Sequence, residues 1–219
     1  MLTRLNRAWR LLLRTPSAGA ASLVYSAAIH ASSMHADILD LGNPWWIVTA
    51  AIVLLFSPLF HAFIIQRTFA SIQGIPFRLR DLPAESFGSL VAGEILVNVA
   101  VVLGSVFFLL PGVYAGLRLI YYKQAVVLHK ARISSAVRES LLLTADGRRL
   151  VKTFVVLAVS YCVPVGIDLL ALPAADALWV HVVAVAISTL FIAWINVYLT
   201  LAFVEDAQTD ENGESAGAS

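Results

Sequence analysis

Charged residues and cysteine are both scarce in this chain. Only 13% of its 219 residues are charged, against about a quarter in a typical soluble protein. A single cysteine excludes a disulfide framework and a cysteine-ligated zinc or iron–sulfur site. The 12 glycines and 8 prolines are too few for a collagen-like or low-complexity chain. Apolar residues are abundant instead, at 59% with a mean hydropathy of +0.82, so the composition predicts a polytopic membrane protein rather than a water-soluble globule.

Six stretches are long and apolar enough to cross a bilayer. A hydrocarbon core about 30 Å thick requires about 20 apolar residues in a helix. Six segments within residues 16–203 meet this requirement: residues 16–34, 44–66, 88–109, 112–129, 153–172 and 177–203. The first is rich in small residues, and the fourth follows Pro111 and contains Arg118. We therefore expect an all-α fold, a polytopic bundle of about six transmembrane helices.

Lysine and arginine are strongly segregated between these stretches. Fourteen of the 15 lie in residues 1–15, in the connection after the second stretch, or between Lys123 and Lys152. The three opposite connections contain none. Because cytoplasmic loops retain basic residues, we expect both termini in the cytoplasm.

The two ends of the chain differ in character from the apolar stretches. In residues 1–15, which carry four arginines, the apolar side chains recur at helical spacing: Leu5, Trp9, Leu12 and Leu13. This pattern predicts an amphipathic helix on the cytoplasmic headgroups, with a targeting peptide as the alternative. Residues 204–219 contain five acidic residues and no basic one. We expect them to form a disordered, solvated tail.

Ionisable side chains inside a membrane are costly, so each needs a partner or a function. His61, Glu94 and Arg118 fall at similar depths near the cytoplasmic ends of their stretches, and Asn98 and Asn196 lie deeper on the same half. Two interpretations of this polar cluster stay open. In the first, Glu94 and Arg118 form a buried pair that locks neighbouring helices, with His61 as a neutral partner. In the second, the cluster is a site open to the cytoplasm for a lipid headgroup or a small ion.

The second interpretation assigns a role to nearby basic residues. Arg118 contacts the headgroup, because a guanidinium matches phosphate with two parallel hydrogen bonds. Lys123, Lys130 and Arg132 supply the surrounding attraction to an anionic lipid. Residues 133–147 follow directly and place apolar side chains at helical spacing, which predicts an amphipathic helix on the cytoplasmic surface.

The segment from Pro111 to Lys152 carries a recognisable order of residues. A Pro-Gly pair opens a stretch, a tyrosine and an arginine follow, and a spaced series of small and polar residues precedes basic ones: Pro111, Gly112, Tyr114, Arg118, Ala136, Ser140, Leu143, Thr144 and Gly147. This order resembles the YciC-like inner-membrane family and the related membrane domain attached to some glycerophosphodiester phosphodiesterases. The resemblance implies a multi-pass integral protein of the bacterial inner membrane, and an organellar membrane is the alternative. It does not imply the phosphodiesterase activity, because the chain lacks the length for an additional barrel of about 250 residues.

Two glycines in this segment suggest close helix packing. Gly112 and Gly116, just after Pro111, form a G-x-x-x-G pair that lets another helix approach. Packing within the bundle is the simpler interpretation, and self-association of two copies is the alternative.

The sequence gives no basis for a catalytic, metal or cofactor site. It contains no H-E-x-x-H metal pair and no P-loop, and Cys162 is most simply a small packing residue. No nucleic-acid partner is expected. We expect a non-enzymatic integral membrane protein that acts through contacts with the lipid bilayer, including anionic lipid, or with another membrane protein. The alternative is a small transporter or channel component, which needs a continuous polar lining.

Overall fold

The computed structural model describes residues 2–33, 44–78, 82, 84–107, 109–171 and 178–217. Every regular element in these ranges is a helix, which confirms the all-α prediction. The elements run in this order: α1 (Leu2–Arg14), α2 (Pro16–Ser33), α3 (Trp45–Gln73), the short 3-10 helix η2 (Ala84–Ser86), α4 (Phe87–Phe107), α5 (Leu109–Arg118), α6 (Tyr122–Leu128), α7 (Ile133–Leu143), α8 (Gly147–Ala171) and α9 (Leu178–Gly217). The predicted connections at residues 35–43 and 173–176 lie outside the described residues.

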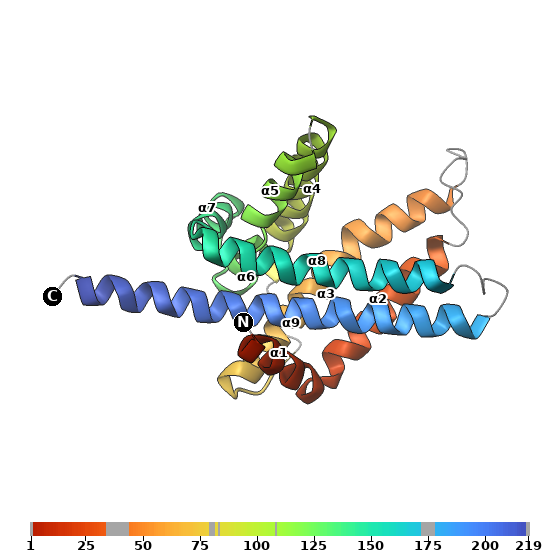
Figure 1. Ribbon diagram of the computed structural model, residues 1–219, viewed down its shortest axis with the longest axis horizontal. Coiled ribbons are helices and arrows are strands. Elements are labelled where there is room, and N and C mark those ends of the chain that lie inside the picture. Colours follow the sequence, from red (N-terminus) through yellow and green to blue (C-terminus); the bar gives the residue numbers. More distant parts are fainter. Residues whose placement is uncertain are drawn as a thin grey trace.

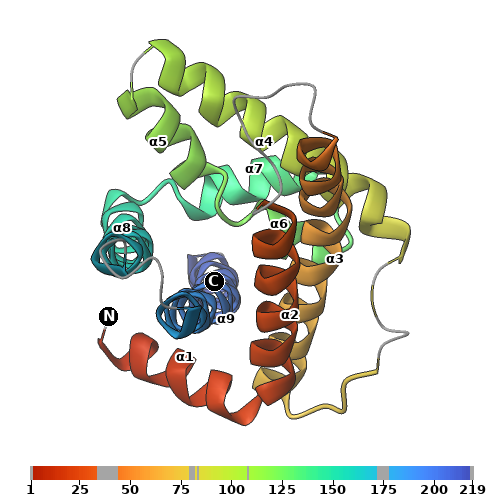
Figure 2. The same ribbon diagram turned by 90° about the vertical axis from the view of Figure 1, so that its right-hand side faces the viewer.

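The last helix, α9, is the centre of the arrangement. It packs against α1, α2, α3, α7 and α8, and Figure 2 shows it nearly end-on with α1, α2 and α8 around it. Its buried face supplies much of the core, including Val197, Leu201 and Phe203. The α4–α5 hairpin instead leans away from α8 and α9 (Figure 1). The bundle therefore has a compact half around α9 and a hairpin that stands apart from it.

Local chemistry explains how the long helices end. α1 and α2 meet at Thr15, whose hydroxyl donates to the Leu11 carbonyl at 2.8 Å, and Pro16 opens α2. Proline suits this first position because the N–H that it lacks would have no helical partner there. α3 is capped at its C-terminal end by Gly74, which adopts a left-handed backbone with φ of 69° and whose N–H donates to the Ala70 carbonyl. Glycine takes this conformation without the steric cost that a side chain would add.

The predicted fourth stretch, residues 112–129, is not one helix in the structure. It is divided between α5 and α6, with a break after Arg118. α7 stabilises the break through Ser140, whose hydroxyl accepts from the Tyr121 backbone N–H at 3.1 Å and donates to the Arg118 carbonyl at 2.8 Å. Ser140 thus supplies a partner for the buried Tyr121 N–H, and the Thr144 hydroxyl also donates to the Arg118 carbonyl, at 3.2 Å.

Two predicted boundaries differ in the structure. The surface helix expected over residues 133–147 ends earlier, because α7 stops at Leu143 and Gly147 already begins α8. The segment expected to be a disordered tail, residues 204–219, continues α9 as far as Gly217. The tail prediction rested on composition alone, whereas Val204 is buried beside Phe69 and Leu128, and Asp206 is buried against Arg4 of α1.

Two described helices contain a stretch long and apolar enough to cross a membrane. By length and composition these stretches are Phe87–Val106 in α4 and Val182–Thr209 in α9. In their most apolar windows, 11% and 39% of the residues are buried inside the protein. The 40 residues of α9 span about 60 Å at 1.5 Å per residue, so this helix is about twice as long as a bilayer core is thick. The fold is thus consistent with membrane association, while six crossings stay a prediction.

Candidate functional site: a buried polar cluster

Three helices bring four polar side chains together inside the bundle. Ser57 and His61 lie one turn apart on α3, Glu94 lies on α4, and Lys123 lies on α6. Glu94 Oε1 accepts from Lys123 Nζ and from Ser57 Oγ, each at 2.9 Å. The Glu94 and Lys123 side chains are only 13% and 20% exposed. This group, which we call the α3–α4–α6 cluster, is a shielded ion pair with a hydroxyl and an imidazole beside it.

The shortest contact in the cluster indicates which ring nitrogen of His61 carries a hydrogen. His61 Nδ1 lies 2.7 Å from the Ser57 carbonyl, 3.1 Å from Ser57 Oγ and 3.4 Å from Lys123 Nζ. A carbonyl oxygen can only accept, so Nδ1 carries a hydrogen and donates a hydrogen bond to the Ser57 carbonyl. Nδ1 therefore cannot also accept from Lys123. The hydroxyl of Ser57 and the ammonium of Lys123 are left to donate to Glu94.

The cluster is only partly satisfied. Glu94 Oε2 and the Tyr122 hydroxyl are both buried, and neither has a hydrogen-bond partner among the described residues. Tyr122 reaches this position because Gly93 leaves room for it, since a Cβ there would lie 2.7 Å from Tyr122 Cε2. A buried carboxylate oxygen without a partner is costly. The site therefore has unused capacity for a proton, a water molecule or a small polar ligand.

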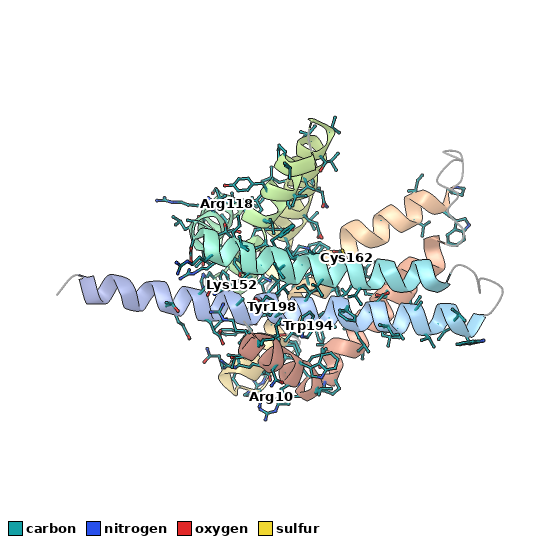
Figure 3. The ribbon with its side chains drawn as sticks, viewed as in Figure 1. Arg10, Arg118, Lys152, Cys162, Trp194 and Tyr198 are labelled. Atoms are coloured by element: carbon teal, nitrogen blue, oxygen red, sulfur yellow. The ribbon has the colours of Figure 1, made fainter. Side chains whose placement is uncertain are left out.

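Arg118 is not the partner of Glu94, so the predicted pair between them is wrong. Its Nη1 donates to the Thr144 carbonyl at 2.6 Å, and its guanidinium lies 5.9 Å from the Tyr114 ring centre. Figure 3 shows Arg118 beside α7. A positive charge at the end of α7 is favourable, because the last carbonyls of a helix carry partial negative charge. The prediction failed because it assumed one continuous helix through this segment.

The remaining predicted residues are dispersed. Asn98 is exposed on α4, and buried Asn196 donates to the Ile192 carbonyl within its own helix, so neither extends the cluster. Among the expected headgroup contacts, Lys123 is turned inward to Glu94, whereas Lys130 and Arg132 are exposed between α6 and α7. Lys123 was predicted to be a headgroup contact, whereas in the structure it belongs to the α3–α4–α6 cluster.

Ser57 was missed altogether. Its signal was available, because it stands four residues before His61 and residues at that spacing share one face of a helix. Pro58 follows it inside α3, and a proline in a helix removes one backbone hydrogen bond. A serine and a histidine on one face of an apolar stretch could have indicated a shared polar site.

The expected packing glycines lie at the α4–α5 contact. A Cβ at Gly112 would meet Ser105 Oγ, the Ser105 nitrogen and the Val101 carbonyl oxygen, the last two at 2.7 Å. At Gly116 the nearest atom is a Val101 methyl carbon at 3.4 Å. The first glycine is therefore essential for the close approach of the two helices, and the second is not. Pro111 is exposed near the start of α5.

Comparison with family models, curated proteins and solved structures found no match. The geometry is then the only guide to chemistry. Within the described ranges, no three His, Cys, Asp or Glu side chains are grouped to hold a metal ion. Residues 213–217 do spell G-x-S-x-G, but they lie in the last turns of α9 and not at the strand-to-helix turn that a nucleophile elbow requires. The cluster offers a carboxylate, an ammonium, an imidazole and a hydroxyl that can hold a proton or a small polar group.

Proposed function

We propose that this chain is a multi-pass integral protein of the bacterial inner membrane, with both termini in the cytoplasm and no catalytic site. It acts through contacts with lipid or with a partner membrane protein, as an organiser of the membrane or envelope. The resemblance of Pro111–Lys152 to the YciC-like family and to the phosphodiesterase-linked membrane domain supports this proposal.

The observation that carries the proposal is the uncovered apolar surface of the α4–α5 hairpin. Val102, Val106 and Leu110 are 59%, 73% and 79% exposed. Soluble monomers rarely expose a contiguous apolar surface of more than a few hundred Å². Burying such side chains in hydrocarbon removes them from water at about 25 cal/mol per Å². A lipid environment accounts for this surface without requiring a protein partner along its whole length.

Orientation rests on the basic residues. Fourteen of the 15 lysines and arginines fall in segments that the proposed topology places on one side. Arg67 near the end of α3 donates to Ser17 at the start of α2 at 3.2 Å, and Arg4 of α1 contacts Asp206 of α9 at 2.8 Å. The first contact joins α3 to α2 and the second joins α1 to α9, in each case at ends that the proposed topology places in the cytoplasm.

Alkaline carbonate extraction of membranes tests the proposal. An integral protein stays in the pellet after carbonate washing and is released only by detergent, whereas a peripheral protein is released by the wash. Native mass spectrometry of the detergent-solubilised chain then shows whether lipid or a partner protein stays bound. Release of the full-length chain by carbonate would contradict the proposal, because it would show that the exposed apolar helices do not lie in hydrocarbon.

A small transporter or channel component is the second candidate. It is favoured by Glu94 Oε2, which has no hydrogen-bond partner in the described part of the chain and lies in the cluster with Lys123 and His61. Ionisable groups within a membrane often mark the path of an ion or proton. A flux assay in proteoliposomes distinguishes the two. Transport needs a flux that Glu94→Gln abolishes, whereas the lipid-contact function predicts no flux in either protein.

A further inference from the structure

A polar pocket lies where the N-terminal helix meets α8 and α9. Its volume is about 400 Å³, and two tyrosines and two threonines contribute to its lining. Its charged lining consists of four basic and two acidic side chains: Arg4, Arg148, Arg149, Lys152, Asp146 and Asp206. Figure 3 shows Lys152 on α8 beside Tyr198 on α9, and both line this pocket. We call it the α1–α8–α9 pocket.

The acidic side chains pair with only part of the basic side chains that line the pocket. Arg4 is held at 2.6 Å by Glu205 and at 2.8 Å by Asp206. Burial lowers the pKa of Arg4, but the hydrogen bond and charge of Asp206 and the charge of Glu205 raise it overall. The side chains of Arg148 and Lys152, in contrast, are exposed and make no ion pair within the described residues. An incoming anion would therefore find free donors on α8.

The position of these donors favours an anion further. Arg148 and Arg149 lie in the first turn of α8, where the helix dipole is positive and basic side chains are disfavoured. Asp146 offsets this locally, because its Oδ1 accepts from the Arg148 backbone N–H at 2.9 Å. A second negative group in the pocket would relieve the remaining repulsion. Guanidinium and ammonium groups next to a helix N-terminus are the donors that proteins use for phosphate.

An apolar groove adjoins the pocket. It has a volume of about 380 Å³ and lies between α1 and α9, where Leu5, Trp9 and Trp194 contribute to its lining. Leu5 follows Arg4 directly, and the Trp194 ring lies 6.2 Å from the ring of Tyr198. Both the polar pocket and the apolar groove are thus lined by α1 and α9. A ligand with a phosphate at one end and a hydrocarbon chain at the other fits this arrangement.

We propose that the α1–α8–α9 pocket binds the phosphate headgroup of an anionic lipid and that the adjoining groove between α1 and α9 takes the start of an acyl chain. Arg148 and Lys152 donate to the phosphate oxygens. Arg4 stays paired with the acidic residues of α9 and positions α1, so that Leu5 and Trp9 flank the chain. This inference rests on the proposed membrane function, and it assigns the headgroup to residues other than Lys130 and Arg132.

Binding to the full-length protein in a neutral detergent tests the proposal. The probes are dioctanoyl phosphatidic acid, dioctanoylglycerol, which lacks the phosphate, and inorganic phosphate, which lacks the chains. We expect saturable binding of phosphatidic acid and much weaker binding of the other two. Equal binding of dioctanoylglycerol would overturn the role of the basic pocket. Equal binding of inorganic phosphate would show an anion site that does not use the groove and would overturn the assignment to lipid.

Paired variants locate the site. Arg148→Gln/Lys152→Met should raise the Kd for dioctanoyl phosphatidic acid at least about tenfold, because charge-assisted hydrogen bonds to the phosphate are lost. Lys130→Met/Arg132→Gln removes the same charges from two exposed residues outside the pocket and should change the Kd less than about twofold. An equal loss in both variants would show unspecific charge attraction and would overturn the assignment.

A measurement on the unaltered chain does not depend on how the variants fold. Lys152 and Lys130 are both exposed, so an amine-acetylating reagent should modify both. Dioctanoyl phosphatidic acid should protect Lys152 and leave the modification of Lys130 unchanged in peptide mass spectrometry. Absence of protection, or equal protection of both lysines, would contradict the site. Either result would leave carbonate extraction unaffected, so failure of this inference is distinguishable from failure of the membrane proposal.

Discussion

Removal of the carboxylate of Glu94 should destabilise the protein strongly. Its Oε1 lies 2.9 Å from Lys123 Nζ, and the Lys123 side chain is only 20% exposed. Loss of one partner from a buried pair leaves the other charge uncompensated, which typically costs about 3 to 5 kcal/mol. Glutamine keeps an amide oxygen that can still accept from Lys123 and Ser57. We therefore expect Glu94→Gln to lower the free energy of unfolding by about 3 kcal/mol, the lower end of that range.

The same chain offers a matched control. Glu139 pairs with His129 at 2.8 Å, but these side chains are 28% and 50% exposed. Solvent screens exposed pairs, so Glu139→Gln should cost less than about 1 kcal/mol. Glu94→Gln/Lys123→Met removes both buried charges and should recover most of the stability lost in the single variant.

Reversible unfolding of the detergent-solubilised protein by increasing mole fraction of dodecyl sulfate, followed by circular dichroism, measures these differences. A Glu94→Gln cost no larger than that of Glu139→Gln would refute the reasoning. A double variant that loses as much stability as Glu94→Gln and Lys123→Met lose in sum would do the same, because it would show that the two charges do not depend on each other.

Three further substitutions test contacts elsewhere. Gly112→Ala forces a methyl group onto the α4 backbone and should cost about 1 to 3 kcal/mol of unfolding free energy. Ser140→Ala leaves the buried Tyr121 backbone N–H without its partner at the break between α5 and α6, so it should cost about 1 to 3 kcal/mol in the same assay. Arg4→Gln leaves the Asp206 side chain, which is 6% exposed, without its cation, and should increase the rate at which trypsin cleaves α1.

Each of these has a control close by. Gly116→Ala meets its nearest atom at an ordinary contact distance of 3.4 Å and should be nearly neutral. Ser134→Ala changes an exposed serine on the same helix as Ser140, and should stay within about 0.5 kcal/mol of the unaltered protein. Arg10 is exposed on α1, so Arg10→Gln removes one trypsin site and should leave the cleavage rate at the other sites of α1 unchanged. Equal effects in a variant and its control would contradict the structural explanation of that contact.

Periodicity and composition predicted the helical class but not the break in the fourth stretch. Depths were counted along a continuous helix, which placed Arg118 level with Glu94. The chain turns after Arg118 because Ser140, from a helix later in the sequence, supplies hydrogen bonds to the turn. Lys123 then faces Glu94 instead. A tertiary contact of this kind leaves no periodic signal in the sequence. The predicted pair therefore had the correct acidic residue, Glu94, but the wrong basic residue, Arg118.

The two ends of the chain show the same limit. The amphipathic pattern of residues 1–15 predicted a helix, and α1 forms there. The pattern could not reveal that Ala8 and Leu11 pack inside the protein, or that Arg4 and Arg7 bind Glu205. The complementary charges of the two ends were visible in the sequence. Their pairing requires α9 to continue past Phe203, which the acidic composition argued against.

Labelling of single cysteines from outside intact cells tests the multi-pass topology most directly. In a Cys162→Ala background, cysteines at Asp40 and Asp176, which lie outside the described residues, should react with an impermeant maleimide. Gln73 is exposed at the end of α3, and Gln208 is exposed in the C-terminal part of α9. Cysteines at these two positions should react only after the membrane is permeabilised. Labelling of Gln208→Cys in intact cells would place the C-terminal end of α9 outside and would contradict an even number of crossings with both termini in the cytoplasm.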